Sequence, residues 1–318
     1  MPEKIIIDTD PGIDDAMAIF FAMASPKLEI LGLTTTFGNV SVDMATDNAL
    51  RLVEMSGHDI PVARGVAKPM VQKGLPFPDF VHGKDGFGNV NLPAPKGEAI
   101  EPSAAEFIVQ MVLENPHEVT LVAIGPLGNL ALALQLEPKI ASLVKNVVIM
   151  GGTVLEGGNM SPVAEANIVG DPHAADKVFT ADWHVHMVGL DVTHKVVMSD
   201  QVQANIRDKN PMCGEFLYKA GRFYSDFYKA SRGADGCYVH DSSAIAYVID
   251  PSLFGVEVGP VRVATEGVAL GQTILKRTGY DYAFDHWENI SDSSVCMSVN
   301  AEAVMDLYES TMTANSKV

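Results

Sequence analysis

The sequence predicts an α/β protein with one open, largely parallel, Rossmann-like sheet and helices on both of its faces. Short runs rich in β-branched residues alternate along the chain with longer segments of helical pattern, which is typical of parallel strands joined by crossover helices. The chain has 318 residues, of which 47% are hydrophobic and 19% charged, so it can bury a large core. No segment of linker composition divides the chain into two halves, and we expect one domain over residues 1–318.

The expected elements follow one another strand by strand. Central strands of a parallel sheet are buried on both faces, so apolar runs without polar alternation indicate them. We expect strands at Lys4–Ile7, Ile30–Thr35, Val119–Ile124, Val147–Met150 and Val185–Leu190. Helices are expected between them at Asp14–Met23, Val42–Met55, Ala104–Glu114, Leu130–Leu134 and Pro172–Phe179. Ligands of such sheets bind outside the carboxyl ends of the strands, so we look for chemistry directly after each strand.

Two local patterns refine this prediction. Asp171 before Pro172 is typical of a helix cap followed by proline at the first helical position, so we leave Asp171 out of the site. The segment Gly74–Gly97 holds nine glycines and prolines in 24 residues. Irregular loops of that length are often functional, and we expect a lid over a binding site.

Composition narrows the class of function. Lys and Arg total 22 and Asp and Glu 40, a net charge of −18, which disfavours binding to nucleic acid or to anionic membranes. Cys213, Cys237 and Cys296 lack metal-ligand spacing and predict neither a disulfide framework nor a zinc site, so a reducing compartment is expected. The N-terminus has no signal-peptide pattern and the apolar run Ala16–Ala24 is too short to cross a bilayer. We expect a cytoplasmic protein that acts on a small molecule.

A carboxylate cluster follows the first expected strand. Asp8, Asp10, Asp14 and Asp15 lie within eight residues, and Gly12 allows a tight turn between them. Hard cations such as Ca²⁺ and Mg²⁺ prefer oxygen ligands, so the cluster is a credible half of a metal site. The alternative is that Asp14 and Asp15 stabilise a helix N-terminus, which requires no metal.

These residues resemble a known family. The string from Asp8 to Ala16 (DTDPGIDDA) is similar to the N-terminal signature of the nucleoside hydrolases, the inosine-uridine-preferring N-ribohydrolases. The resemblance continues in order through nearly the whole chain, at Thr36–Val40, Ala123–Leu127, Met150–Gly152, Glu165–Asn167, Asp171–Pro172 and His240–Asp241. Several motifs in the right order are far more specific than any one of them.

The resemblance implies the nucleoside hydrolase fold and a Ca²⁺-dependent cleavage of ribonucleosides to free base and ribose. By similarity, the Ca²⁺ ligands are Asp10, Asp15, the backbone carbonyl of Ile124, and Asp241. Asp10 resembles the general base that takes a proton from the metal-activated water, and His240 resembles the acid that protonates the leaving base. Taken alone, a histidine beside an aspartate is more often structural than catalytic.

The resemblance also implies substrate contacts. The contacts to ribose or base are expected at Asp14, Asn39, His82, Met150, Asn159, Glu165, Asn167, Tyr224, Tyr228 and Arg232. The last three are four residues apart on an expected helix and share a face, although a tyrosine stripe of that spacing is usually core. Read without the family, Asn39 is a loop residue and Glu165 with Asn167 a surface loop. A homodimer or homotetramer is expected.

Two positions depart from the family pattern. Gly128 stands where a threonine is common, and the missing hydroxyl could weaken support for the Ile124 carbonyl. Ala166 stands where an aromatic residue is common, which would widen the pocket. Preference for purine or pyrimidine bases is therefore left open.

Two other functions compete with this prediction. Asp8 and Asp10 after a first strand also resemble the opening of haloacid-dehalogenase phosphatases, with Asp8 as nucleophile, Mg²⁺ as metal, and Gly170, Asp171 and Asp176 as the later acidic motif. That family does not account for Asp14, Asp15 or His240. A non-catalytic nucleoside-binding protein on the same scaffold is the second alternative, whereas nicotinamide binding is disfavoured because no glycine-rich fingerprint follows the first strand.

Overall fold

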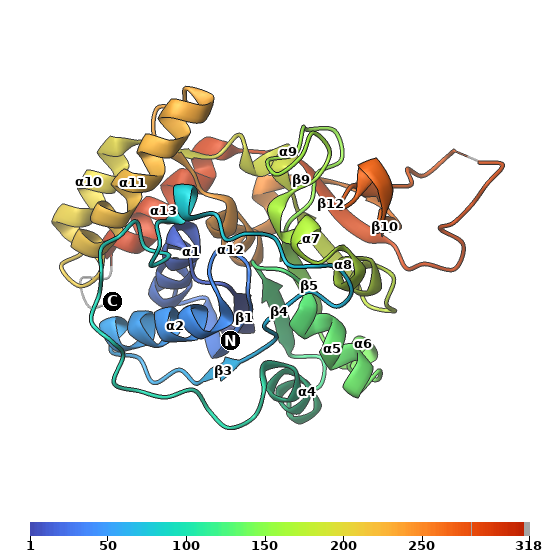
Figure 1. The fold of residues 1–318 in the computed structure, drawn as a ribbon, viewed down its shortest axis with the longest axis horizontal. Helices are drawn as coiled ribbons and strands as arrows, with labels where there is room; N and C mark the ends of the chain where they lie inside the picture. The colour runs from blue at the N-terminus through green and yellow to red at the C-terminus, as the bar shows by residue number, and fades with distance from the viewer. Residues whose placement is uncertain (281, 315–318) are drawn as a thin grey trace.

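An eight-stranded sheet forms the centre of the computed structural model, which describes residues 1–280 and 282–314 (Figure 1). Its strand order is β3-β2-β1-β4-β5-β6-β12-β9. All neighbours in it are parallel except β9, which is antiparallel to β12. The strands are β1 (Glu3–Thr9), β2 (Leu28–Thr35), β3 (Val62–Arg64), β4 (Val119–Ala123), β5 (Asn146–Met150), β6 (Val185–Val188), β9 (Phe254–Gly259) and β12 (Ser293–Val299). The predicted α/β class and largely parallel sheet are confirmed.

Helices cover both faces of this sheet. One apolar core packs against α1 (Ile13–Ala24), α2 (Val42–Ser56), α10 (Asp200–Lys209), α11 (Gly214–Arg232), α12 (His240–Ile249) and α13 (Ala301–Ala314). A second core on the opposite face packs against α4 (Ala104–Glu114), α5 (Gly128–Leu136), α6 (Ile140–Leu143) and α8 (Pro172–Phe179). Figure 1 shows these two groups of helices on either side of the strands. The short helices are α3 (Asp79–His82), α7 (Ala166–Gly170) and α9 (Leu190–Thr193), and two small hairpins pair β7 (Val197–Met198) with β8 (Cys237–Tyr238) and β10 (Val261–Val263) with β11 (Thr273–Leu275).

The predicted elements, which run from Lys4 to Leu190, are present with small shifts at their ends. The segment Val185–Leu190 is the main exception, because β6 ends at Val188 and Leu190 already begins α9. Gly189 lies between them against the backbone of Gly152, where a Cβ would come within 2.6 Å of the carbonyl oxygen. This close approach turns the chain out of the sheet.

The segment Gly74–Gly97 is less irregular than its composition predicts. It contains α3, and Asp85 organises the loop that follows by accepting hydrogen bonds from the backbone N–H groups of Phe87, Asn89 and Asn91 at 2.7–2.8 Å. The first part of the segment is more exposed, with Leu75 and Phe77 each 44% accessible.

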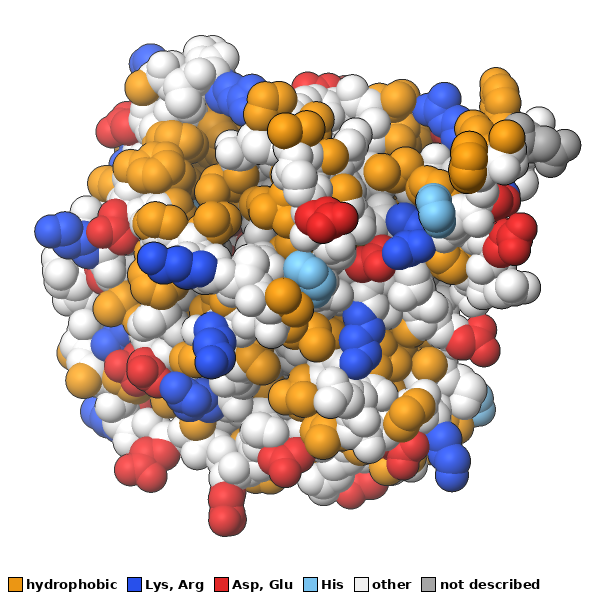
Figure 2. Space-filling model, turned by 45° about the vertical axis from the view of Figure 1, so that its right-hand side comes forward, with side chains coloured by type: hydrophobic (Ala, Val, Ile, Leu, Met, Phe, Trp, Pro, Cys, Tyr) orange, Lys and Arg blue, Asp and Glu red, His pale blue; other side chains and the backbone are white. Residues whose placement is uncertain are grey.

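The surface in Figure 2 carries lysines and arginines interspersed with acidic side chains, and no continuous basic patch is visible on this face. No helix in the described part of the chain has both the length and the apolar character needed to span a bilayer. The three cysteines are buried free thiols.

Candidate active site

The site lies where the carboxyl ends of β1, β2, β4 and β5 meet. Because β1 pairs in parallel with both β2 and β4, and β4 with β5, the residues after these strands come together at one edge of the sheet. They surround a cavity of about 250 Å³. Of the predicted site residues, the cavity is lined by Asp14, Asn39, His82, Ile124, Met150, Asn159, Glu165, Asn167, Tyr224, Tyr228, Arg232, His240 and Asp241.

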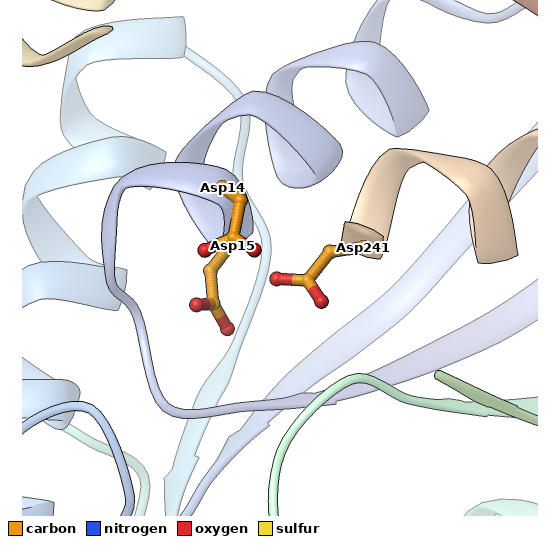
Figure 3. A group of neighbouring side chains, drawn as sticks. All are labelled: Asp14, Asp15 and Asp241. Carbon is orange, nitrogen blue, oxygen red and sulfur yellow. The ribbon is translucent and has the colours of Figure 1, made fainter. Parts of the chain in front are cut away.

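Three buried carboxylates from two helices converge at the cavity. Asp14 and Asp15 come from the first turn of α1 and Asp241 from the first turn of α12 (Figure 3). Each offers a ligand atom within 4.8 Å of the other two. Both helix N-termini favour negative charge at this position. The close approach nonetheless raises electrostatic energy, because no Lys or Arg in the described part of the chain pairs with them.

Asp15 is the best-supported member of this group. Its Oδ1 accepts a hydrogen bond from the Thr9 hydroxyl at 2.6 Å, and its Oδ2 accepts from the backbone N–H of Gly12 and from Asn39 Nδ2, both at 2.9 Å. Donors on both oxygens hold the carboxylate in one orientation.

Asp10 is not among the residues that line the cavity, and only one of its two carboxylate oxygens has a hydrogen-bond partner. Its Oδ2 accepts from the backbone N–H of Asn39 at 2.5 Å, whereas its Oδ1 has no partner among the described residues. Two glycines make room for this carboxylate, since a Cβ at Gly38 or Gly125 would clash with it. Asn39 therefore joins Asp10 to Asp15 through its backbone and its side chain.

The donor set fits a hard divalent cation. Asp14 Oδ1, like Asp10 Oδ1, is buried and has no hydrogen-bond partner in the part of the chain that is described. Burial raises the pKa of Asp14 to about 7 and raises the pKa values of Asp10 and Asp241 well above their usual range. Unpartnered carboxylate oxygens at a site of this kind match the all-oxygen ligation that Ca²⁺ prefers. The group with mutually close ligand atoms contains Asp14 rather than Asp10, so ligation by Asp10 stays a prediction.

Asn167 supports the backbone carbonyl of Ile124. Its Nδ2 donates to that carbonyl at 2.9 Å and to the carbonyl of Met150 at 3.1 Å. Both amide hydrogens are thereby used, and only Oδ1 is left to accept from a ligand hydroxyl. A Cβ at Gly128 would meet Val66 at 2.6 Å. Val66 thus fills the space beside Gly128, and the Ile124 carbonyl draws its support from Asn167.

Glu165 caps a helix as well as lining the cavity. Its carboxylate accepts from the backbone N–H groups of Gly152, Asn167 and Ile168 at 2.9–3.2 Å, at the start of α7. Burial raises its pKa to about 7. Asn159 is exposed at the rim, and its Oδ1 accepts from the backbone N–H of Ala166 at 3.0 Å. Both side chains border the cavity, and their contacts to ribose stay predictions.

Histidines and tyrosines form the opposite wall. His240 and Tyr228 are buried and joined at 2.9 Å, and Tyr224 donates to Asp14 at 3.0 Å. The predicted shared face of α11 is confirmed, and its tyrosines are core residues that also line the cavity. Arg232, the last residue of that helix, is exposed at the mouth.

His82 connects the segment Gly74–Gly97 to the carboxylate cluster. Its Nδ1 accepts a hydrogen bond from the backbone N–H of Ile13 at 3.2 Å, so the ring carries its hydrogen on Nε2. Burial lowers its pKa to about 3. Gly12 is required beside it, because a Cβ there would come within 2.6 Å of the ring.

Several lining residues were not predicted from the sequence. They include Pro78, Phe80, Val81, Met160, His194, Phe227 and Ser231. Phe227 and Ser231 lie on the helix that carries Tyr224, so the helical repeat could have indicated them. His194 follows a short helix that the sequence did not predict, and no local pattern marks it.

Comparison with known proteins identifies the class. The family model "Inosine-uridine preferring nucleoside hydrolase" matches residues 5–306. The chain is 45% identical over 310 residues to uridine nucleosidase 1 of Arabidopsis thaliana, covering 96% of this chain and 91% of the relative. It is 41% identical over 279 residues to the inosine-uridine preferring nucleoside hydrolase of Leishmania major, covering 86% and 88%.

Comparison with solved structures identifies the same class of protein. A plant nucleoside hydrolase, the PpNRh1 enzyme, superposes with a TM-score of 0.96 at 39% identity over 99% of this chain and 100% of that chain. A purine-preferring ribonucleoside hydrolase from Gardnerella vaginalis gives a TM-score of 0.92 at 31% identity, with 99% of each chain covered. Fold, site and comparisons define the protein as a glycosidase that cleaves the N-glycosidic bond of ribonucleosides. The chain belongs to the inosine-uridine preferring nucleoside hydrolase family.

Membership in this family excludes both competing functions. In the phosphatase alternative Asp8 would be the nucleophile. Its Oδ1 accepts from Thr34 and Asn129 at 2.5 and 2.7 Å, and although its Oδ2 has no partner among the described residues, the side chain does not line the cavity and so cannot meet a substrate there. Asp8 is therefore a buried structural carboxylate.

Proposed function

We propose that the protein hydrolyses ribonucleosides, of purine bases, pyrimidine bases or both, with a resident Ca²⁺, using Asp10 as general base and His240 as general acid. The observation that carries this proposal is the convergence of the buried carboxylates Asp14, Asp15 and Asp241, beside which Asp10 Oδ1 and Asp14 Oδ1 have no hydrogen-bond partner among the described residues. An enzyme would keep such an arrangement for a ligand, because unpaired buried charge destabilises a fold.

The residues that would hold the ion are Asp10, Asp15, Asp241 and the carbonyl of Ile124. When bound, the ion supplies positive charge that makes a neighbouring water more acidic. Asp10 then takes the proton of that water on Oδ1, the atom left without a partner. Asn39 keeps Asp10 aligned from the other side through its backbone N–H.

The remaining polar groups orient the sugar and the base. Asn167 Oδ1 and Asp14 Oδ1 are acceptors for ribose hydroxyls, since the other hydrogen-bonding capacity of both side chains is engaged. The base lies toward Tyr228 and His240. Negative charge grows on the departing base as the bond breaks, and a donor on that side stabilises it and delivers the proton.

The names of the relatives support a range of bases rather than one. They include a uridine nucleosidase, an inosine-uridine preferring hydrolase and a purine-preferring hydrolase. A panel of common ribonucleosides scored for free ribose would establish the preference of this chain.

The experiment that tests the mechanism compares two leaving groups on one variant. His240→Ala should slow hydrolysis of inosine or uridine by about 10²–10⁴-fold, because natural bases leave poorly without a proton. An activated aryl riboside, whose phenolate departs unprotonated, should be hydrolysed at nearly the original rate. Equal losses on both substrates would show that His240 only supports Asp241.

A further inference from the structure

A chain of hydrogen bonds runs across the base side of the cavity and extends beyond His240. Tyr224 donates to Asp14 Oδ2 at 3.0 Å, the two tyrosine hydroxyls are 3.3 Å apart, and Tyr228 lies 2.9 Å from His240 Nε2. The far end is Thr193, whose Oγ1 lies 2.8 Å from His240 Nδ1. Every member of the chain is buried.

Counting hydrogens gives the direction of this chain. A tyrosine hydroxyl has one hydrogen, and Tyr224 uses its own on Asp14. When the contact between the tyrosines uses the hydrogen of Tyr228, the oxygen of Tyr228 accepts from His240. We assign the ring hydrogen of His240 to Nε2 on this network.

Thr193 is then the partner of the other ring nitrogen. A hydroxyl both donates and accepts, and with the ring hydrogen on Nε2 the Thr193 hydroxyl donates to Nδ1. Thr193 ends α9, whose first residue, Leu190, donates its backbone N–H to the carbonyl of Gly152 at 2.9 Å. This bond fixes the position from which the hydroxyl is presented.

We infer that Thr193 is a positioning residue for the reaction, which holds the His240 ring at Nδ1 so that Nε2 stays directed at the Tyr228 hydroxyl. This inference rests on the proposed role of His240 as the acid. Thr193 lies 47 residues from His240 in the sequence and does not line the cavity, so its effect reaches the substrate only through the imidazole.

The test replaces the hydroxyl while keeping the shape. Thr193→Val should lower kcat for uridine or inosine by roughly tenfold, the worth of one hydrogen bond of about 1–1.5 kcal/mol, with KM within twofold. Hydrolysis of an activated aryl riboside should be unchanged, and Thr193→Ser should restore most of the lost kcat. Thr46→Val, which removes a buried threonine hydroxyl on α2, is the matched control and should not change the ratio of the two substrates.

A second readout separates this inference from the proposed acid role. The ¹⁵N shifts of the His240 imidazole should report hydrogen on Nε2 in the original protein and in Thr193→Ser, and a mixture of tautomers in Thr193→Val. Unchanged shifts in Thr193→Val, or equal slowing of both substrates by it, would overturn the role of Thr193. Failure of the acid role would instead appear in His240→Ala as equal losses on the two substrates.

Discussion

Acidic side chains at the two ends of the central sheet differ in whether they have partners. At the amino end, Glu3 on β1 pairs with Lys145 and accepts from the Thr120 hydroxyl at 2.6 Å, while Lys4 pairs with Glu118 at 2.7 Å. These pairs are partly exposed and each acid has a cation. At the carboxyl end of the same strand, Asp10 is 1% exposed and keeps one oxygen without a partner among the described residues.

This difference indicates that the carboxyl end of the sheet is the end arranged to bind a ligand. Exposed ion pairs contribute little to stability, but they leave no group unsatisfied. Buried carboxylates without a cation lower stability and are tolerated where function requires them. The predictions below use the amino end as the internal control for the carboxyl end.

The largest expected effect concerns the ribose diol. Asn167 and Asp14 offer acceptors that only a hydroxyl satisfies, so removal of the 2′-hydroxyl leaves buried polar groups unpaired. Sites that hydrogen-bond a substrate hydroxyl discriminate by about 10⁴-fold against the analogue without that hydroxyl. Rates with uridine and 2′-deoxyuridine measure the ratio directly, and similar rates would show that the diol is bound elsewhere.

The next effect separates function from stability at Asp10. Asp10→Asn keeps the shape but removes the proton acceptor, so we expect kcat/KM to fall by roughly 10³-fold. The same change should raise the free energy of unfolding in the presence of a chelator, because it removes a buried carboxylate whose charged form is unfavourable. The control Glu3→Gln at the amino end should leave kcat unchanged and slightly lower stability. An Asp10→Asn protein with full activity would remove Asp10 from the mechanism.

Ca²⁺ should stabilise the folded protein by binding the carboxylates at the carboxyl end of the sheet. An ion that binds only the folded state adds about 2.7 kcal/mol at a free concentration of 100 times Kd. Thermal unfolding with Ca²⁺ and with a chelator measures this difference, and Asp241→Asn should reduce it strongly. Identical unfolding temperatures under both conditions would argue against a resident Ca²⁺.

The smallest expected effect lies at the amino end and depends on pH. Burial lowers the pKa of His186 to about 4, and the ring is held neutral between Tyr247 at 2.9 Å and Asn146 at 3.3 Å. The unfolded chain, with an ordinary histidine pKa near 6.5, binds the proton first as pH falls. Stability is therefore present above about pH 6.5 and is lost as pH falls toward 4.

His186→Gln should remove this component. Because the ring is partly solvated, we expect about 1–2 kcal/mol between pH 7 and pH 4.5 in the difference between the two proteins. Urea unfolding at both pH values measures it, and activity at pH 7 should be unaffected. A difference that does not vary with pH would show that the ring titrates normally in the fold.

Much of the fold could be predicted from the sequence, because its signals are local. Three consecutive isoleucines indicate β1, and Asp171 with Pro172 indicates the cap of α8, where Asp171 accepts from the backbone of Ala174. The strands β3, β9 and β12 were not predicted. The strand β12 inserts between β6 and β9, and its serines give it no apolar run to indicate a buried strand.

The sequence by itself determined the first carboxylate group and its turn, since Asp8 to Asp15 lie within one strand, one loop and one helix start. Only the tertiary structure decided which distant residues complete the site. Asn167 reaches the Ile124 carbonyl across 43 residues, and Thr193 reaches His240 across 47. Such partners are brought together by the parallel order of the strands, and no local periodicity records that order. The burial of the Asp10 and Asp14 carboxylates likewise follows from packing, because the groups that enclose them come from segments far apart in the sequence.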